Sequence, residues 1–125
     1  MRLSLSIPIV VRKVKITGPK GSVRVDLILD CGAVFTVLSW SVLKVIGYDP
    51  AVVPGRQEIV TANGVIEVPK LQVESITVGD VKAQQVDVIC HDIPELVGVR
   101  GLLGLSFLKH FRTVIDYKKG YFEIL

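Results

Sequence analysis

Apolar and polar residues alternate along much of the chain, and this period of two is typical of half-buried β-strands. Alternating runs cover residues 9–16 and 23–30, and the sequence GPKGS at 18–22 lies between them. Glycine, proline and serine favour turns. The two runs are therefore predicted to form a β-hairpin.

A second hairpin is predicted in the sequence QEIVTANGVIEVP at 57–69. This sequence contains Asn63 followed by Gly64, and the pair is a strong hairpin signal because both residues tolerate a positive φ. The turn is expected at this pair, with one strand on either side of it.

The pattern favours two short helices. In SWSVLKVIG at 39–47, Ser39 can cap the start of a helix and Gly47 can end it in the left-handed conformation. A second short helix is expected in LSFLKHF at 105–111. The helix content of the chain should therefore be small.

Four further strands are expected, and turn-forming sequences separate them. About eight short strands, with no internal repeat and no linker, predict one mainly β domain over residues 1–125, a small closed or partly closed β-barrel with one or two short helices. The four strands are Leu71–Val78, Gln84–Cys90, Thr113–Tyr117 and Tyr121–Leu125, with VGD, DIPELVG at 92–98 and KKG between them.

The composition agrees with a β fold. Valine contributes 22 and isoleucine 12 of the 125 residues, and 50% of all residues are hydrophobic. Side chains branched at Cβ pack well on a pleated sheet but lose rotamer freedom in a helix. A chain of this size and apolar content can bury one core without disulfides or metal, so intrinsic disorder is excluded.

Charge and hydropathy exclude two classes of partner. The net charge of +3 comes from 15 basic and 12 acidic residues scattered along the chain, whereas a nucleic-acid site needs a concentrated basic patch. The longest uncharged stretch runs from Cys31 to Leu43, which is shorter than the about 20 mainly apolar residues of a spanning helix. No nucleic-acid partner and no membrane span are expected.

The N-terminus and the cysteines bear on the compartment. The sequence MRLSLSIPIVVRK contains Pro8 and lacks a small-residue cleavage site, so it is expected to be a first strand and not a signal peptide. Cys31 and Cys90 are the two cysteines, which are too few for a disulfide framework. A reducing, cytoplasmic location is expected.

The sequence gives little support for a metal-binding site, a Cys/His catalytic pair or a phosphate-binding loop. Cys90, His91 and Asp92 are adjacent, but neighbouring side chains on a strand point to opposite faces, so they make a poor ligand set or catalytic pair. His110 lies far from them in the sequence, on the second predicted helix. The sequence GLLG at 101–104 lacks the Lys-Ser/Thr of a phosphate-binding loop.

Asp30 is the acidic residue with an unusual position. The alternation in VRVDLILD at 23–30 places four apolar side chains on one face of a strand and Asp30 at its end. Gly32 lets the backbone turn sharply two residues later. An acid in this position can line a cleft, but chance alone supplies about 0.4 Asp-x-Gly triplets in a chain of this length. Whether Asp30 and Gly32 form a functional motif therefore depends on the surrounding sequence.

That surrounding sequence resembles the retropepsin-like aspartic proteases, the single-domain proteases of the retroviral type. VRVDLILDCGAVFTVLS at 23–39 is similar to the family's strand, Asp-Thr/Ser-Gly-Ala loop and following strand. EIVTANGVIEVP at 58–69 resembles the flap, a hairpin with a small tip that closes over substrate. GLLGLSFLKHFRTVIDYKKGYFEI at 101–124 is similar to the family's apolar-apolar-Gly element, short helix and closing strands, and the resemblance covers residues 9–125 in all.

The resemblance implies an aspartic endopeptidase whose two catalytic carboxylates share one proton. One chain contains a single Asp-x-Gly triplet, so a twofold homodimer would bring Asp30 together with the Asp30 of its partner. The substrate would be a peptide or protein, and neither a metal nor an organic cofactor is needed. The implied site residues are Asp30, Cys31 and Gly32 for catalysis and Ala33, Thr61, Ala62, Asn63 and Gly64 for substrate binding.

Two positions depart from the family pattern. Cys31 stands where relatives have Thr or Ser, whose hydroxyl links the two catalytic loops of the dimer, and a thiol is a weaker donor and acceptor. The alternative function is therefore an inactive peptide-binding or dimerisation module. Ser106 stands where relatives often carry Asp, and it is expected to cap the second helix. Gly101 and Gly104 either allow close packing only or, as the resemblance implies, support the catalytic loop from behind.

Overall fold

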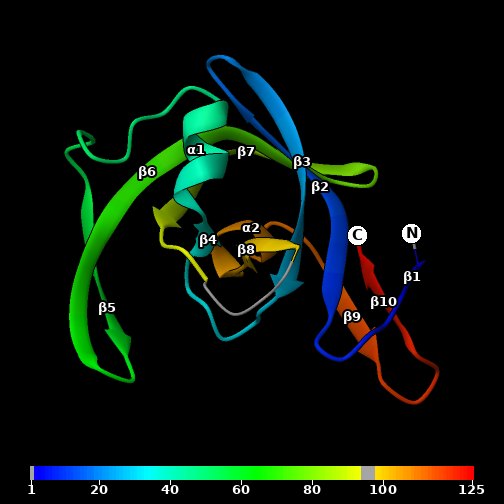
Figure 1. Cartoon of the computed structure of the whole chain (residues 1–125). Helices are drawn as coiled ribbons and strands as arrows, with labels where there is room; N and C mark the ends of the chain where they lie inside the picture. Colours follow the sequence, from blue (N-terminus) through cyan, green and yellow to red (C-terminus); the bar gives the residue numbers. More distant parts are fainter. Residues whose placement is uncertain (1, 94–97) are drawn as a thin grey trace.

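The computed structural model describes residues 2–93 and 98–125, and in this part the chain forms ten strands and two short helices (Figure 1). The prediction of a mainly β fold is confirmed. The turn expected at 92–98 lies partly outside the described residues. In chain order the elements are β1 (Arg2–Ser4), β2 (Val10–Gly18), β3 (Gly21–Leu29), β4 (Thr36–Leu38), α1 (Trp40–Val45), β5 (Arg56–Thr61), β6 (Gly64–Val78), β7 (Val81–Cys90), β8 (Val99–Leu103), α2 (Leu105–Leu108), β9 (Thr113–Asp116) and β10 (Tyr121–Ile124).

Most of the strands form a ring of hydrogen-bonded neighbours. The order is β2, β3, β8, β4, β7 and β6, and the far end of β6 pairs again with β2. β8 runs parallel to β3 and antiparallel to β4, so it lies between the strand before residues 30–35 and the strand after them. β5 pairs with the first part of β6, and together they extend from the ring as the hairpin arm (Figure 1).

The first predicted hairpin is confirmed as β2 and β3. The strands begin and end close to the predicted runs at 9–16 and 23–30, and Gly18 pairs with Gly21 at the tip. The turn is therefore tighter than the predicted 18–22. A positive φ of 128° at Gly21 allows this tight turn, because glycine has no Cβ to clash.

The turn of the hairpin arm lies one residue earlier than predicted. Thr61 pairs with Gly64, so Ala62 and Asn63 form the turn. The Thr61 hydroxyl accepts a hydrogen bond from the Asn63 amide at 3.3 Å and donates to the Gly64 carbonyl at 3.0 Å. Gly64 has a φ of 115°, whereas Asn63 keeps a negative φ. The threonine side chain, acting as a local turn partner, selects this geometry.

The strand after this turn is longer than predicted. β6 runs unbroken from Gly64 to Val78. Two separate strands were expected here, one before and one after Pro69. Pro69 has no amide hydrogen, but it pairs with Arg56 at the start of β5, and the Lys70 amide donates to the Gly55 carbonyl at 3.0 Å. The ladder therefore continues past the proline, as edge pairing allows.

Helix α1 has the predicted caps. The Ser39 hydroxyl accepts a hydrogen bond from the Val42 amide at 3.4 Å, and Gly47 follows the helix with a φ of 105°. These contacts satisfy amides at the helix start and let the chain reverse at its end. No helix in residues 2–93 and 98–125 is long and apolar enough to cross a membrane.

Helix α2 differs from the prediction in length and cap. It covers Leu105–Leu108 instead of 105–111, and its N-cap is Gly104, which makes no side-chain hydrogen bond. The expectation that Ser106 caps this helix is therefore wrong. Ser106 lies inside the helix and is buried, and its hydroxyl accepts a hydrogen bond from the Thr36 amide of β4 instead.

The two ends of the chain lie side by side in a three-stranded sheet with the order β1, β10, β9 (Figure 1). The N-terminal segment, expected as one strand, is divided. Arg2–Ser4 pairs with β10, and a loop containing Pro8 leads into β2. The other two strands of this sheet match the predicted Thr113–Tyr117 and Tyr121–Leu125 to within one residue.

The main core cluster joins the strands of the ring, both helices and β10. Its largest fully buried side chains are Phe107 of α2 and Phe122 of β10. Burying each phenylalanine stabilises the fold by about 1.5–3 kcal/mol. A second, smaller cluster is formed by Val37, Val68 and Ile89, which connect the base of the hairpin arm to β4 and β7.

Gly101 generates the first prediction, because β8 passes very close to β4 there. Its φ is 155°, and a Cβ atom would overlap the carbonyl oxygen of Val37. Gly101→Ala is expected to lower the free energy of unfolding by about 2–4 kcal/mol. Gly120→Ala is the matched control, since Gly120 has a φ of 74° in open space, and its loss should be about 1 kcal/mol. Denaturant unfolding measures both losses, and equal values would contradict the predicted clash.

Candidate active site

Asp30 follows the last residue of β3 and is held there by the backbone. The Asp30 amide donates a hydrogen bond to the Leu103 carbonyl of β8 at 3.0 Å. The preceding amide, Leu29, donates to the Ile9 carbonyl at 2.9 Å. Both sides of the strand end are therefore tied, and the half-buried Asp30 side chain begins a loop with a defined position.

The Asp30 loop, residues 30–35, is closed by local hydrogen bonds. Asp30 Oδ1 accepts from the Gly32 amide at 2.9 Å, and the Asp30 carbonyl accepts from the Ala33 amide at 3.3 Å. The first bond orients the carboxylate. Cys31 lies between these residues with an exposed, free thiol.

Helix α2 and the end of β8 lie against the back of the Asp30 loop. The Leu105 amide donates to the Ala33 carbonyl at 2.8 Å. A Cβ atom on Gly104 would lie 2.8 Å from the Ala33 carbonyl oxygen and 2.5 Å from that of Phe35. Gly104 therefore allows a close backbone approach to the loop, so close packing and support from behind describe the same contact there. Gly101 allows a close approach to Val37 of β4, which is close packing outside the loop.

Buried hydroxyl groups tie the end of the Asp30 loop to α2. The Thr36 amide donates to Ser106 Oγ at 2.8 Å, and Ser106 Oγ donates to Thr36 Oγ1 at 3.1 Å. Thr36 Oγ1 also accepts from the Gly104 amide at 3.1 Å. Thr36 is completely buried and Ser106 nearly so, and a buried polar group without a partner would cost about 1–3 kcal/mol. This network rigidly joins β4, β8 and α2.

A cleft of about 580 Å³ lies between the Asp30 loop and the hairpin arm. Most of its lining is apolar, with a carboxylate at Glu58 and an amide at Gln57. The ammonium group of Lys70 lies 4.7 Å from the centre of the Phe35 ring, which forms part of the wall. The lining residues are Gly32, Ala33, Val34, Phe35, Val37, Gln57, Glu58, Ile59, Val60, Ile89 and Leu102.

The sequence-predicted site residues are only partly brought together by this cleft. Gly32 and Ala33 line it, whereas Asp30 and Cys31 are their immediate neighbours in the loop. The predicted substrate-binding residues Thr61, Ala62, Asn63 and Gly64 form the tip of the hairpin arm and do not line the cleft in this single chain.

Several residues of the cleft were not predicted from the sequence. Ile59 comes from the inner face of β5, and alternation along the predicted strand could have indicated it. Phe35, Ile89 and Leu102 come from three segments distant in the sequence. Only the pairing of β4 with both β7 and β8 brings those side chains together.

The Cys90–Asp92 run has a structural role. Cys90 is buried at the end of β7, whereas Asp92 Oδ1 accepts a hydrogen bond from the Trp40 amide at 3.0 Å, at the start of α1. Burial, together with the charge of Asp92, raises the pKa of the Cys90 thiol to about 11. Across residues 2–93 and 98–125, no three metal-ligating side chains come together.

Comparison with known proteins agrees with this architecture. Residues 13–110 match the model of a protein family described as gag-polyprotein putative aspartyl protease. No curated protein matches the chain. Among solved structures, the chain is similar to a retropepsin-like aspartic protease from Rickettsia conorii, with a TM-score of 0.73 and 20% identity over 100% of this chain and 97% of that one. The retropepsin-like fold expected from the sequence is confirmed.

The two cysteines are expected to react very differently with a thiol reagent. At about pH 8, Cys31 should be alkylated while Cys90, buried and with a raised pKa, should stay unmodified until the chain unfolds. The fold favours the neutral Cys90 thiol over the thiolate. The contribution of this preference to the free energy of unfolding is therefore complete below the unfolded pKa of about 8.5, and it is lost as the pH rises towards 11.

Mass spectrometry of the intact protein before and after addition of denaturant counts the modified thiols. Cys31→Ala is the control, and it should remove the modification of the folded protein. Rapid labelling of Cys90 in the folded state would contradict its burial.

Proposed function

The chain belongs to the gag-polyprotein putative aspartyl protease family, and on that premise we propose that it is an aspartic endopeptidase active as a homodimer. The position of Asp30 is the observation that carries the proposal. Its carboxylate is oriented by the Gly32 amide in a loop beside an apolar cleft, and Gly104 of the family-like segment allows the end of β8 and α2 to support that loop.

The proposed reaction needs two carboxylates that share one proton. Like charges a few ångströms apart cannot both ionise easily, so one carboxylate of the pair can keep its proton while the other is ionised. The ionised carboxylate takes a proton from a water molecule, which attacks the carbonyl carbon of the peptide bond. The protonated carboxylate donates its hydrogen bond to the carbonyl oxygen and stabilises the developing charge. The carboxylate that took the proton from water then donates it to the peptide nitrogen as the C–N bond breaks.

A homodimer follows from the count of catalytic loops. Asp30 is the one aspartate in the sequence with glycine two residues later, so a single chain supplies one of the two carboxylates. A twofold axis next to the Asp30 loop would place Asp30 of both subunits together. Exposed apolar side chains near that loop and on the hairpin arm support such an interface: Val34 is 64% exposed, and the cross-strand pair Val60 and Val65 are 83% and 62% exposed.

The hairpin arm is proposed to act as the flap over the substrate. Its inner face, which carries Ile59 and Ile66, is continuous with the small core cluster beneath the cleft. Its outer edge strand, β5, ends the order of the seven-stranded sheet. An extended peptide held between this arm and the Asp30 loop would place its side chains against the apolar cleft wall.

A second candidate function rests on Cys31. The family-like position carries an exposed thiol, which is a weaker hydrogen-bonding group than the hydroxyl of Thr or Ser. If the two loops of a dimer are poorly linked, the chain acts as a peptide-binding or dimerisation module without turnover. A dimer that binds peptides but cleaves none at any acidic or neutral pH would establish this alternative.

Asp30→Asn is expected to abolish peptidase activity while leaving the fold intact. The amide cannot share a proton as a carboxylic acid does, so kcat should fall by at least about 1,000-fold. Asn keeps an oxygen that can accept from the Gly32 amide, so the free energy of unfolding should change by less than about 0.5 kcal/mol. Cleavage of a peptide library and denaturant unfolding measure the two quantities.

Asp49→Asn is the matched control for this experiment. Asp49 Oδ1 accepts from the Ala51 amide at 3.1 Å, which is the same local contact two residues along the chain as at Asp30. Its substitution should leave turnover unchanged. Retained turnover in purified Asp30→Asn would remove Asp30 from the mechanism.

Cys31→Thr is expected to strengthen the dimer or raise its activity. Each hydrogen bond that a hydroxyl makes better than a thiol is worth about 1 kcal/mol, or roughly a fivefold gain in dimer affinity. Activity measured during serial dilution, together with light scattering, gives the dissociation constant of the dimer. Cys31→Ala lacks the hydroxyl and should gain nothing. Equal affinity and turnover in the wild type and Cys31→Thr would show that this position does not link the two loops.

A further inference from the structure

Strand β2 carries one extra residue opposite Asp26 of β3. Val11 pairs with Leu27 and Val14 pairs with Val25, so two residues of β2 face the single residue Asp26. This arrangement is a β-bulge, in which the extra residue shifts the pairing of everything beyond it by one position.

The bulge lets β2 bury side chains on both sides of it. Val11 and Val14 are three residues apart, so an unbroken strand would point them to opposite faces of the sheet. Both are fully buried in the main core cluster, as is Ile16. With the same residues in a regular strand without the bulge, burial of Val14 and Ile16 would turn Val11 towards solvent.

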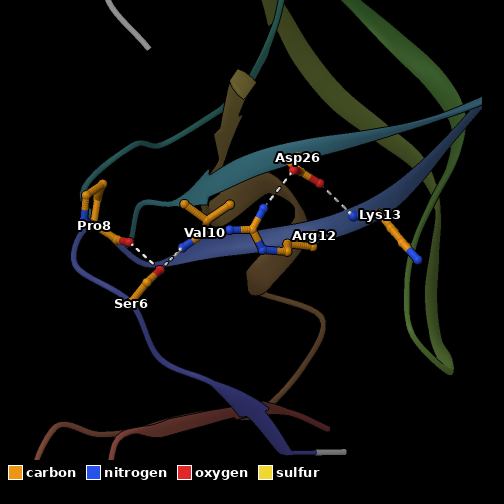
Figure 2. Close-up of polar contacts among 6 residues, drawn as sticks. All are labelled: Ser6, Pro8, Val10, Arg12, Lys13 and Asp26. Carbon is orange, nitrogen blue, oxygen red and sulfur yellow. Dashed lines mark hydrogen bonds and ion pairs between the residues drawn. The ribbon is translucent and has the colours of Figure 1, made fainter. Parts of the chain in front are cut away.

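The carboxylate of Asp26 holds the bulge in place (Figure 2). Lys13 has a φ of 55°, a left-handed conformation that residues with a Cβ atom rarely adopt. Asp26 Oδ1 accepts a hydrogen bond from the Lys13 amide at 3.0 Å, and Oδ2 accepts from Arg12 Nη1 at 3.1 Å. The Asp26 side chain thus binds Arg12 and Lys13, the two residues of β2 that lie opposite it in the bulge.

The register of β3 also shifts against its other neighbour, β8, and this shift begins at Asp26 as well. Asp26 pairs with Val99 of β8 and Ile28 pairs with Leu102, so β8 also has one residue more than β3 across this interval. Beyond Asp26, the last residues of β3 are therefore offset against both neighbouring strands. These residues lead directly to Asp30.

The position of Asp30 depends on this offset register. The Leu29 amide donates to the Ile9 carbonyl on the β2 side, and the Asp30 amide donates to the Leu103 carbonyl on the β8 side. A slip of one residue in β2 would move Ile9 away from Leu29 and break the first of these bonds.

A turn before β2 holds the Ile9 carbonyl from the other direction. Ser6 Oγ donates to the Pro8 carbonyl at 2.7 Å and accepts from the Val10 amide at 3.3 Å, so one hydroxyl spans the residues on both sides of Ile9 (Figure 2). The segment that receives the Leu29 amide is thus held at the turn by Ser6 and at the bulge by Asp26.

We propose that Asp26 is a positioning residue for Asp30, a role that rests on the proposed function. Its carboxylate maintains the left-handed conformation of Lys13, and the bulge in turn maintains the register of the strand that ends at Asp30. Without the carboxylate, the bulge can open or move along β2. The Asp30 carboxylate then loses the fixed position that a proton-sharing pair requires.

Amide hydrogen exchange tests this role without reference to activity. Asp26→Ala is expected to raise the exchange rates of the Leu29 and Asp30 amides by at least about tenfold, while rates in the β6–β7 hairpin stay unchanged. Asp26→Asn keeps an oxygen that can accept from the Lys13 amide, and its rates should remain within about twofold of the wild type.

Lys13→Gly supplies a rescue that a general loss of stability would not show. Glycine adopts a positive φ without steric cost, so the bulge no longer needs the Asp26 carboxylate. Combined with Asp26→Ala, Lys13→Gly should restore slow exchange at Leu29 and Asp30. If Asp26→Ala alone does not fold, a folded double variant with both amides protected supports the proposal. A double variant with unprotected amides, or one that does not fold, overturns it.

Peptide cleavage provides the second readout. Asp26→Ala should lower kcat by about 100-fold and change KM by less than about threefold, because the cleft is intact while the carboxylate pair is misplaced. Asp87→Ala is the matched control, since Asp87 accepts from the Gln72 side chain at 2.9 Å between β6 and β7, and its kcat should equal that of the wild type. Unchanged exchange and unchanged kcat in Asp26→Ala overturn the proposal. A wild type that cleaves no peptide contradicts the proposed function, and the exchange rates then decide the role of Asp26 in positioning Asp30.

Discussion

β8 packs backbone against backbone on the segments that precede and follow Asp30, and the arrangement of the other elements around the site depends on this contact. It runs parallel to β3 and antiparallel to β4, so one strand ties both ends of the Asp30 loop. Gly101 leaves room for the Val37 carbonyl, and Gly104 leaves room for the carbonyls of the loop itself. A side chain at Gly101 would push β8 away from β4, and a side chain at Gly104 would push the Asp30 loop outwards.

The proposed chemistry of the site depends on a carboxylate with few degrees of freedom, and this contact restricts Asp30 in that way. Asp30 is bonded through its amide to β8 and through Oδ1 to the Gly32 amide, so its carboxylate has a defined direction before any partner arrives. Preorganised groups stabilise a transition state without further cost of ordering. Under the proposed mechanism one chain supplies one such carboxylate, because Asp30 is the one aspartate in the sequence with glycine two residues later.

The end of β3, which leads to Asp30, is positioned by irregular pairing with the neighbouring strands. β3 is regular in its own sequence, but both of its neighbours contain an extra residue opposite its middle. Bulges increase the local twist and redirect the strand end, and they are common beside functional sites. The polar contacts of the half-buried Asp26 and the exposed Ser6 show how polar side chains at the surface can stabilise such irregularities while the core remains apolar.

The sequence by itself determined the strands with clear alternation, the caps of α1, and the strand-end position of Asp30, because each depends on residues near one another in the chain. The segments that resemble the retropepsin-like family also predicted the fold. Tertiary structure decided the rest. The three-residue spacing of Val11 and Val14 conflicts with a regular strand, and only the bulge opposite Asp26 reconciles it. Ser106 was expected to act within its own helix, but a buried hydroxyl bonds to whatever polar group lies nearest in space, and that group is in Thr36, far away in the sequence.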